Sequence, residues 1–317
     1  MVKFVKIFRD LSQIPEKYKN AVITLGNFDG LHLGHRAIVS EAKTIAEKEG
    51  CALALMTFEP HPREFFARES NKEGIRIYNL RSKLAIIKSL GVECIFLMRF
   101  NNSLTNLSAH DFIKNILVDT LSARHIITGE NFYFGKNRSG DRQLMAREAV
   151  ALSFGYTACP QVTDENDDII SSSAIRKLLK QGDMKKVALL LNRSYQINGR
   201  VQRGEGRGKT IGFPTANLAL DKLFLPRYGV YAVRARIEGT DKIYNAVANL
   251  GTKPTFGINA PLLEVHLFDV TQDLYGKRIC IEFIEFIRDE QKFSSLSDLK
   301  GQIARDSEVA KEIINNI

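Results

Sequence analysis

The sequence predicts an α/β protein in which a doubly wound parallel sheet is followed by a small antiparallel β-barrel with a terminal helix. Three observations lead to this fold class. Strand-like and helical segments alternate from 21 to about 191, short strands follow one another after about 193, and a last helical pattern begins near Leu296. A chain of 317 residues favours two domains. We expect them at 1–192 and 193–317, with the boundary between Asn192 and Tyr195.

Four apolar runs predict the strands of the first domain. They are AVITLGNF (21–28), CALALMTF (51–58), VECIFLMRF (92–100) and RHIITG (124–129). Continuous apolar runs of this length are typical of strands buried on both faces, as in a parallel sheet.

Apolar residues with helical spacing fill the segments between these runs. Helices are expected at 35–50, 80–91, 108–123, 140–155 and within 171–192. Gly50 ends the first of them, and Ser108 is a helix cap for the third. Strands that alternate with helices of these lengths predict a parallel sheet covered on both faces.

The second domain has a different pattern. Partly alternating strands are expected at 195–204, 228–239, 242–251, 263–270 and 277–288, separated by Gly, Asp and Pro turns. Short strands in close succession, followed by one helix, indicate a small antiparallel barrel.

Composition and charge place the chain among globular proteins of the cytoplasm. Apolar residues make up 44% and charged residues 26% of the sequence, without an apolar run that could span a bilayer. The N-terminus lacks the apolar core of a secretory signal. The four cysteines, Cys51, Cys94, Cys159 and Cys280, lie far apart in apolar runs, as reduced core residues do. A net charge of +9 favours an anionic partner, either nucleic acid or a small phosphorylated ligand.

The most informative stretch is TLGNFDGLHLGHRAIV (24–39), where a strand gives way to a helix. Ligands of parallel sheets gather at this point, beyond the carboxyl ends of the strands. Glycines allow close backbone approach, and the helix offers free N–H groups to an anion. His32 and His35 can then face one phosphate and stabilise charge that develops during transfer. Taken alone, an H-x-x-H pattern is more often two surface or core histidines near a turn. The glycine loop, with a strand before it and a helix after it, favours a phosphate site instead.

A second motif is SSSAIR (171–176). It places hydroxyls, N–H groups and the guanidinium of Arg176 at the start of a helix, which suits a polyphosphate. A plain serine cap with a solvated arginine is the simpler interpretation of this segment taken alone.

Together these motifs resemble a known family. GNFDGLHLGH matches the G-x-F-D-G-x-H-x-G-H pattern of the HIGH-type nucleotidyltransferases, and ISSSAIR resembles their I-S-S-T-x-I-R motif with Ser173 in place of Thr. TFEPHP and TGENFYFGKNRSGD resemble segments of one branch, the bacterial bifunctional riboflavin kinase/FMN adenylyltransferases, also called FAD synthetases. The resemblance covers nearly the whole chain.

The resemblance implies roles for the residues of the first domain. His32, His35 and Arg176 would be catalytic, with the histidines on the phosphates of ATP during adenylyl transfer. The implied ATP-binding residues are Gly26, Phe28, Asp29, Gly34, Asn131, Ser172 and Ser173. An FMN phosphate oxygen would attack the α-phosphorus of ATP, so that FAD forms and pyrophosphate leaves. Because the nucleophile is already anionic, positioning and electrostatics can supply the catalysis.

The second domain contains GEGRGKT (204–210), which is similar to a Walker A loop but fails its spacing. Walker A places four residues between its first Gly and Gly-Lys-Thr, and Arg203 stands where that Gly is required. A glycine-rich flap over phosphates is the better interpretation, and a plain hairpin turn is the alternative. The resemblance implies an ATP-binding role for Gly204, Gly208, Gly212 and Pro214.

GFPTANL (212–218) supplies two hard oxygen ligands, Thr215 and Asn217. Their i, i+2 spacing puts both on one face of an extended segment, in a manner suited to Mg²⁺. Without context they are two polar residues beside a proline turn. The segment closely resembles the P-T-A-N motif of riboflavin kinases, in which Thr and Asn bind MgATP.

Glu264 lies in the apolar strand LLEVHLFD, where a carboxylate could accept the proton of a primary hydroxyl during phosphoryl transfer. A solvent-facing strand residue is the alternative. The resemblance to riboflavin kinases makes this glutamate the base for the ribityl 5′-hydroxyl. The family resemblance also implies that ATP, riboflavin and FMN are partners, that FAD is a product and that Mg²⁺ binds with ATP. It implies no nucleic-acid or membrane partner, and self-association stays open.

Two other functions were weighed against this one. A synthetase-like nucleic-acid binder fits the basic charge, but the chain lacks a K-M-S-K-S segment. A catalytically inactive flavin carrier is disfavoured because His32, His35, Arg176, Thr215, Asn217 and Glu264 are all present.

Overall fold

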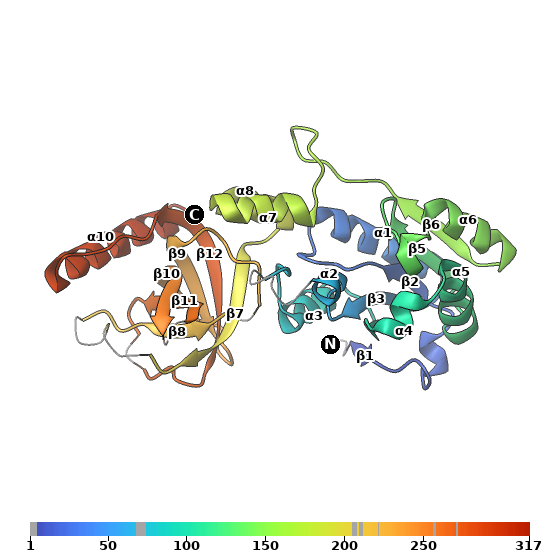
Figure 1. The fold of residues 1–317 in the computed structure, drawn as a ribbon, viewed down its shortest axis with the longest axis horizontal. Coiled ribbons are helices and arrows are strands. Elements are labelled where there is room, and N and C mark those ends of the chain that lie inside the picture. Colours follow the sequence, from blue (N-terminus) through green and yellow to red (C-terminus); the bar gives the residue numbers. More distant parts are fainter. Residues whose placement is uncertain are drawn as a thin grey trace. The chain divides into compact units, whose positions relative to one another are not determined.

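The computed structural model describes residues 5–67, 74–204, 208, 212–220, 222–255, 258–270 and 272–317. The contacts within the chain divide it into two units, Met1–Ser172 and Ser173–Ile317, which are shown as a ribbon in Figure 1.

The first unit is built on a six-stranded sheet in the order β1-β4-β3-β2-β5-β6. Its strands are β1 (Lys6–Phe8), β2 (Val22–Leu25), β3 (Leu53–Glu59), β4 (Cys94–Arg99), β5 (His125–Gly129) and β6 (Gly155–Cys159). All neighbouring strands are parallel. The chain adds β3 and β4 on one side of β2 and β5 and β6 on the other. The strand order therefore reverses between β2 and β5, which is where sheets of this kind bind their ligands.

Helices connect these strands. They are α1 (Leu33–Glu49), α2 (Pro62–Phe66), α3 (Leu80–Ser89), α4 (Asn102–Asn106), α5 (Ala109–Asp111), the π-helix Phe112–Thr120 and α6 (Arg142–Ala151), with short 3₁₀ turns at Glu16–Tyr18 and Lys136–Arg138. Side chains of Asn79, Ser108 and Asp141 accept backbone N–H groups at the starts of α3, α5 and α6. Gly50 ends α1 in a left-handed conformation, as its sequence position predicts.

One core of the first unit lies between the sheet and the helices on one face. It includes Ile23, Met56 and Phe96 of the strands with Phe112 and Met145 of the helices, all buried. Burial of this apolar surface fixes the sheet, and with it the edge where the loops after β2 and β5 emerge.

The second unit is a closed antiparallel barrel in the order β10-β11-β8-β7-β12-β9. Two helices precede it, α7 (Ser172–Gln181, whose first residue belongs to the first unit) and α8 (Met184–Leu191). The strands are β7 (Tyr195–Gln202), β8 (Ala216–Ala219), β9 (Gly229–Ile237), β10 (Ile243–Thr255), β11 (Ile258–Leu267) and β12 (Arg278–Arg288). The terminal helix α10 (Leu296–Asn315) packs on β9, β10 and β12, and Ala310 and Ile314 enter a shared core with Val230 and Val247.

The fold class expected from the sequence is confirmed, with local differences. The strands β1, β6 and β8 were not expected. The segment 108–123 forms α5 and a π-helix where one helix was expected, and Gly182, with φ of 79°, separates α7 from α8. The contacts place α7 and α8 with the barrel, and the domain boundary at 192/193 stays a prediction. None of the four cysteines forms a disulfide.

Candidate functional site

The first candidate site lies where β2 leads into α1. The loop between Leu25 and Leu33 leaves the sheet beside the loop that follows β5, because β2 and β5 are neighbours in register. His32 occupies the N-cap position of α1 with an extended backbone. The helix thus begins directly after His32 and directs its free N–H groups and positive dipole end toward this loop.

The two histidines form one stacked pair. Their ring centroids are 3.7 Å apart with an interplanar angle of 26°, and the ring of Phe28 lies 5.2 Å from that of His35. Phe28 and His32 are buried. The structure therefore brings three residues of the motif together as a small aromatic cluster at the start of a helix.

The glycines of this motif lie where a side chain would disturb the cluster. A Cβ on Gly34 would come within 3.1 Å of the His32 ring, and a Cβ on Gly26 within 3.1 Å of the Phe28 ring. Both contacts are tighter than ordinary van der Waals distances. The motif thus needs glycine at these two positions to bring the rings against the backbone.

Asp29 and Ser172 connect the loop after β2 with the first residue of α7. The Asp29 carboxylate accepts a hydrogen bond from the Ile77 N–H at 2.9 Å, and its backbone carbonyl accepts one from the Ser172 hydroxyl at 2.8 Å. Asp29 is buried. Its carboxylate therefore helps to hold the loop.

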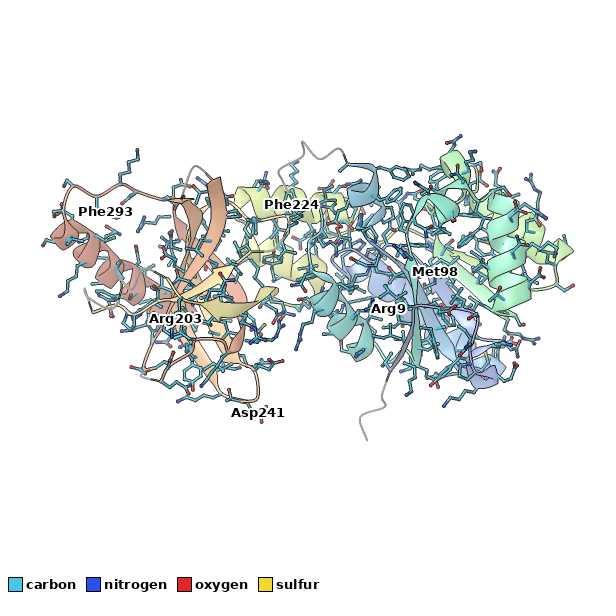
Figure 2. The ribbon with its side chains drawn as sticks, turned by 60° about the horizontal axis from the view of Figure 1, so that its bottom comes forward. Arg9, Met98, Arg203, Phe224, Asp241 and Phe293 are labelled. Atoms are coloured by element: carbon cyan, nitrogen blue, oxygen red, sulfur yellow. The ribbon has the colours of Figure 1, made fainter. Side chains whose placement is uncertain are left out.

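Ser173 and Arg176 follow on α7, which belongs to the second unit from Ser173 onward. The Arg176 guanidinium lies 6.0 Å and the Lys180 ammonium 5.0 Å from the ring centroid of Phe224, which is labelled in Figure 2. The roles of Ser173 and Arg176 toward ATP stay predictions.

Asn131 lies in a different pocket of the first unit, just after β5. This pocket has a volume of about 350 Å³ and is lined by Glu130, Asn131, Tyr133, Asp141, Arg142 and Gln143. Neither histidine lines it. Tyr133 and Arg142 were missed at the sequence level, although Arg142 follows a helix-capping aspartate that the sequence shows.

The second candidate site is a pocket of about 330 Å³ in the barrel unit. Its lining includes Gly208, Thr215 and Glu264, three of the residues singled out from the sequence. Glu264 of β11 lies opposite Asn217 of β8 in the antiparallel register, so the predicted base is beside the predicted metal ligands. His266 donates its Nδ1 proton to the Pro214 carbonyl at 2.8 Å, which ties the P-T-A-N segment to the same strand.

Asn217 has the features of a cation ligand. The residue is 7% exposed, and its Oδ1 atom is buried with no hydrogen-bond partner among the described residues. A buried acceptor without a donor is costly unless something satisfies it. The oxygen chemistry of Thr215 and Asn217 therefore fits Mg²⁺. Groups of three or more His, Cys, Asp or Glu side chains suited to a metal ion do not occur within the described ranges.

The predicted flap glycines approach the predicted metal ligands closely. A Cβ on Gly204 would lie 2.4 Å from Asn217 Nδ2, and one on Gly208 would lie 2.4 Å from the Phe213 carbonyl and 3.2 Å from Thr215 Oγ1. Gly212 has φ of 89°, a conformation that favours glycine. The rest of the predicted flap, 205–207 and 209–211, lies outside the described residues.

The pocket is also lined by residues of β12 and α10 that the sequence patterns do not single out. Asp306 of α10 accepts two hydrogen bonds from Arg288 of β12, at 2.9 and 2.6 Å, and one from Gln302 at 2.9 Å. Phe293, labelled in Figure 2, also lines the pocket. This largely buried ion pair joins α10 to β12 in the pocket that Glu264 also lines.

The first unit is a parallel sheet with paired histidines where its strand order reverses, and the second is a barrel with a carboxylate beside side-chain oxygens. Together they define a two-module enzyme that transfers phosphoryl and nucleotidyl groups. Residues 14–174 match the family model of FAD synthetase and residues 191–314 that of riboflavin kinase. The chain belongs to the family of bifunctional riboflavin kinase/FMN adenylyltransferases.

Individual relatives support the same assignment over the full length. The Bacillus subtilis bifunctional riboflavin kinase/FMN adenylyltransferase is 38% identical, with 100% of this chain and 99% of that protein covered. The enzyme of that description from Escherichia coli K12 is 39% identical over 98% of this chain and 97% of its own. A Streptococcus pneumoniae structure described as a macrolide-efflux protein has 30% identity and a TM-score of 0.85, covering 97% of this chain and 98% of its own.

In the part of the chain that the structure describes, no helix combines the length and apolar character needed to cross a bilayer.

Proposed function

We propose that the first module adenylylates FMN to FAD and that His32 and His35 act directly on the phosphates of ATP. The stacked pair at the N-terminus of α1 carries this proposal. An FMN phosphate oxygen attacks the α-phosphorus of ATP, the bond from that phosphorus to the bridging oxygen breaks, and pyrophosphate leaves. Imidazole and helix N–H groups stabilise the charge that develops, and no general base is required.

Other residues of the two motifs complete this site. Gly26, Phe28 and Gly34 shape the cradle, Asp29 and Ser172 hold it, and Ser173 and Arg176 bind the β- and γ-phosphates. Asn131, in the neighbouring pocket after β5, would act on the substrate phosphates. The hydrogen bond from Ser172 to the Asp29 carbonyl supports a shared role, because it joins the two motifs directly.

The second module phosphorylates riboflavin to FMN. The ribityl 5′-hydroxyl attacks the γ-phosphorus of ATP, its proton passes to the Glu264 carboxylate, and ADP leaves. The position of Glu264 in one pocket with Thr215 and Gly208 supports this role. Gly204, Gly208, Gly212 and Pro214 would position the ATP phosphates.

Thr215 and Asn217 would hold Mg²⁺ together with ATP in the kinase module, where it would neutralise phosphate charge. The Oδ1 atom of Asn217, buried without a hydrogen-bond partner in the described part of the chain, supports this assignment. We place both reactions in the cytoplasm, since the four thiols are free, as expected in a reducing compartment.

Replacement of either histidine tests the first of these roles. His32→Ala or His35→Ala should lower FAD formation from FMN by about 10²–10³-fold, the usual effect of removing one positioned donor. Phosphorylation of riboflavin should be unchanged in the same chain. His110→Ala is the matched control, because its side chain is exposed in the same unit.

FMN and FAD are separated by chromatography after incubation with riboflavin or FMN and MgATP. Parent rates of FAD formation in both histidine variants would overturn the proposal.

A further inference from the structure

The loop that carries the histidines contains two residues in an unfavourable backbone conformation. Phe28 and Leu31 both have φ of 47°, and both side chains are completely buried. Bulky residues rarely adopt this left-handed conformation unless the surroundings enforce it. Contacts around the loop must therefore hold it in place.

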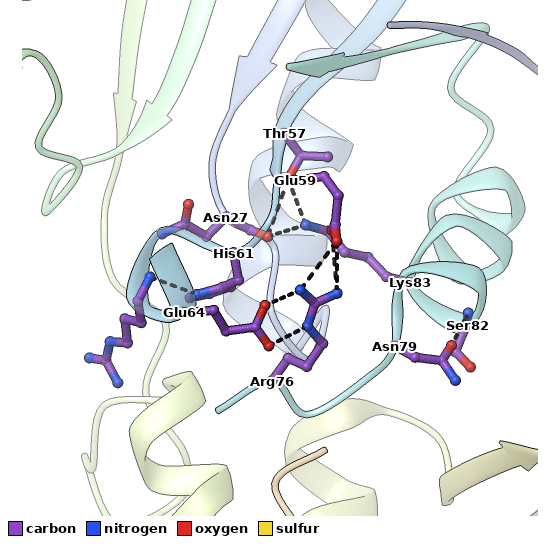
Figure 3. A network of polar contacts seen from close by, with 10 residues as sticks. Asn27, Thr57, Glu59, His61, Glu64, Arg76, Asn79, Ser82 and Lys83 are labelled. Carbon is purple, nitrogen blue, oxygen red and sulfur yellow. Dashed lines mark hydrogen bonds and ion pairs between the residues drawn. The ribbon is translucent and has the colours of Figure 1, made fainter. Parts of the chain in front are cut away.

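Lys83 of α3 provides one such contact, as Figure 3 shows. Its ammonium lies 2.5 Å from the carbonyl oxygen of Asn27 and 2.7 Å from the hydroxyl oxygen of Thr57 in β3. The Thr57 hydroxyl donates to the same Asn27 carbonyl at 3.2 Å. One carbonyl, directly before the strained Phe28, thus receives two side-chain donors from two elements.

Charged groups around Lys83 partly compensate its burial. Lys83 is 7% exposed, and Asp29 and Glu59 favour its charged form, whereas Arg76 opposes it. Arg76 is itself bound by Glu59 at 3.2 Å and by both carboxylate oxygens of Glu64. These groups face Lys83 from the loop, from β3, from α2 and from the segment before α3. Burial is still the largest influence, and it lowers the pKa of Lys83 to about 8.

The contacts of Lys83 continue to the histidines. The Asn27 carbonyl fixes the start of Phe28, the Phe28 ring lies against His35, and His35 stacks on His32. The Phe28 ring also fills the space beside Gly26, where a Cβ would meet it at 3.1 Å. A shift of the carbonyl would therefore move the ring that supports the catalytic pair.

We propose that Lys83 is a positioning residue for adenylyl transfer. Together with Thr57 it holds the Asn27 carbonyl, and the Phe28 ring in turn keeps the rings of His35 and His32 in position. This inference rests on the proposed role of the two histidines. It adds a buried cation whose proposed action on the reaction runs through the Asn27 carbonyl.

Lys83→Met tests the proposal in the full-length protein, because methionine keeps an unbranched apolar stem and removes the donors and the charge. Adenylylation should lose up to about 100-fold in kcat, since small misplacements of catalytic groups have effects of this size. The KM values for ATP and FMN should change far less. Lys88→Met, exposed on the same helix, is the matched control, and riboflavin phosphorylation by the same chain is the internal control.

The pH profile separates positioning from general support of the fold. In the parent enzyme, kcat for adenylylation should fall above about pH 8, because the neutral Lys83 amine makes a weaker hydrogen bond to the Asn27 carbonyl than the ammonium does. The kinase reaction should lack this decrease. The decrease should be absent in Lys83→Met. Thr57→Val, which removes one of the two donors to the carbonyl, should give an intermediate loss and provides a second variant if Lys83→Met folds poorly.

Parent kcat in both Lys83→Met and Thr57→Val would overturn the inference, as would an alkaline decrease that persists in Lys83→Met. If His32→Ala and His35→Ala are inactive while Lys83→Met is not, the proposed function stands and the positioning role fails. If the histidine variants retain the parent rate, the proposed function fails whatever Lys83→Met does.

Discussion

At the residue scale, each of the two candidate sites has a polar side chain packed closely against the backbone of a glycine. Gly34 leaves room for the His32 imidazole, and Gly204 leaves room for the Asn217 amide. In both places a side chain with a proposed chemical role lies against a glycine of the same module. The glycines of both motifs are thus part of the site geometry.

Gly34→Ala should separate activity from stability. Alanine favours the first turn of α1 by up to about 1 kcal/mol over glycine, yet its Cβ would lie 3.1 Å from the His32 ring. Because His32 is stacked on His35, the ring has little room to retreat. We expect a lower kcat for FAD formation with an unchanged or higher melting temperature.

The control for this variant is Gly301→Ala in α10, where the added Cβ would meet only the Arg305 side chain at 3.7 Å. It should gain helix stability without loss of either activity. A Gly34→Ala enzyme with parent adenylylation rates would show that the position of His32 is not critical.

Glu264→Gln should remove most of the kinase activity and leave adenylylation intact. Glutamine keeps the size and one acceptor but cannot take the proton, and general-base catalysis contributes roughly 10²–10⁴-fold. Riboflavin binding should change less than turnover. Both rates are measured on the same preparation, with Glu312→Gln, exposed on α10, as control.

Equal losses of both activities would contradict the idea of two independent sites. Full kinase activity in Glu264→Gln would remove this residue as the base.

At the element scale, the sequence predicted the elements whose patterns are long and regular. The buried strands β2 to β5, the helix α1 and five barrel strands follow directly from apolar runs and helical spacing. β1 has only three residues, and β6 reads GYTAC with one buried side chain, so neither shows a strong pattern. The π-helix was taken for part of a regular helix, because apolar spacing alone does not show that its hydrogen bonds reach one residue further.

The candidate site residues were found through motif spacing, and the contacts that support them were not. Lys83 lies in the apolar stripe of α3 next to Leu84, so its burial could have been suspected, but its partners Asn27 and Thr57 are distant in sequence. The ion pair of Arg288 and Asp306 likewise joins two residues that are far apart in the sequence. Only the folded chain brings such partners together.

Rising pH should stabilise the parent protein relative to Lys83→Met between about pH 8 and 10.5. Burial lowers the pKa of Lys83 from 10.5 to about 8. In this window the unfolded chain carries a proton on Lys83 that the folded chain has released, so the free energy of unfolding rises with pH. Below pH 8 both states are charged, and the cost of burying the ammonium is present in full.

The measurement is the difference in urea unfolding free energy between the parent and Lys83→Met at pH 7 and at about pH 10. Lys88→Met gives the reference for an exposed lysine on the same helix. A difference that is independent of pH would contradict the buried, charged lysine.

At the scale of the whole molecule, the helices α7 and α8 lie between the parallel sheet and the barrel in the sequence and decide where the chain divides. No Gly/Ser-rich linker separates the helical segment 171–192 from the first barrel strand. In the structure, α8 contacts β7 and β12, and Lys185 pairs with Glu285 of β12 at 2.9 Å. The Arg227 N–H donates to the Leu179 carbonyl of α7 at 2.8 Å.

These contacts predict different behaviour for two fragments of the kinase module. A fragment 195–317 starts at the predicted boundary, and a fragment 173–317 also keeps α7 and α8. α8 buries Met184, Val187, Leu190 and Leu191, and each such side chain contributes about 1.5–3 kcal/mol when it is fully buried. The longer fragment should therefore melt at a higher temperature and phosphorylate riboflavin at the parent rate. The shorter one should be less stable, although it retains Thr215, Asn217 and Glu264. Thermal unfolding and kinase assays on both fragments test whether α7 and α8 belong to the kinase module. Equal stability of the two fragments would assign both helices to the first domain, in agreement with a boundary at 192/193.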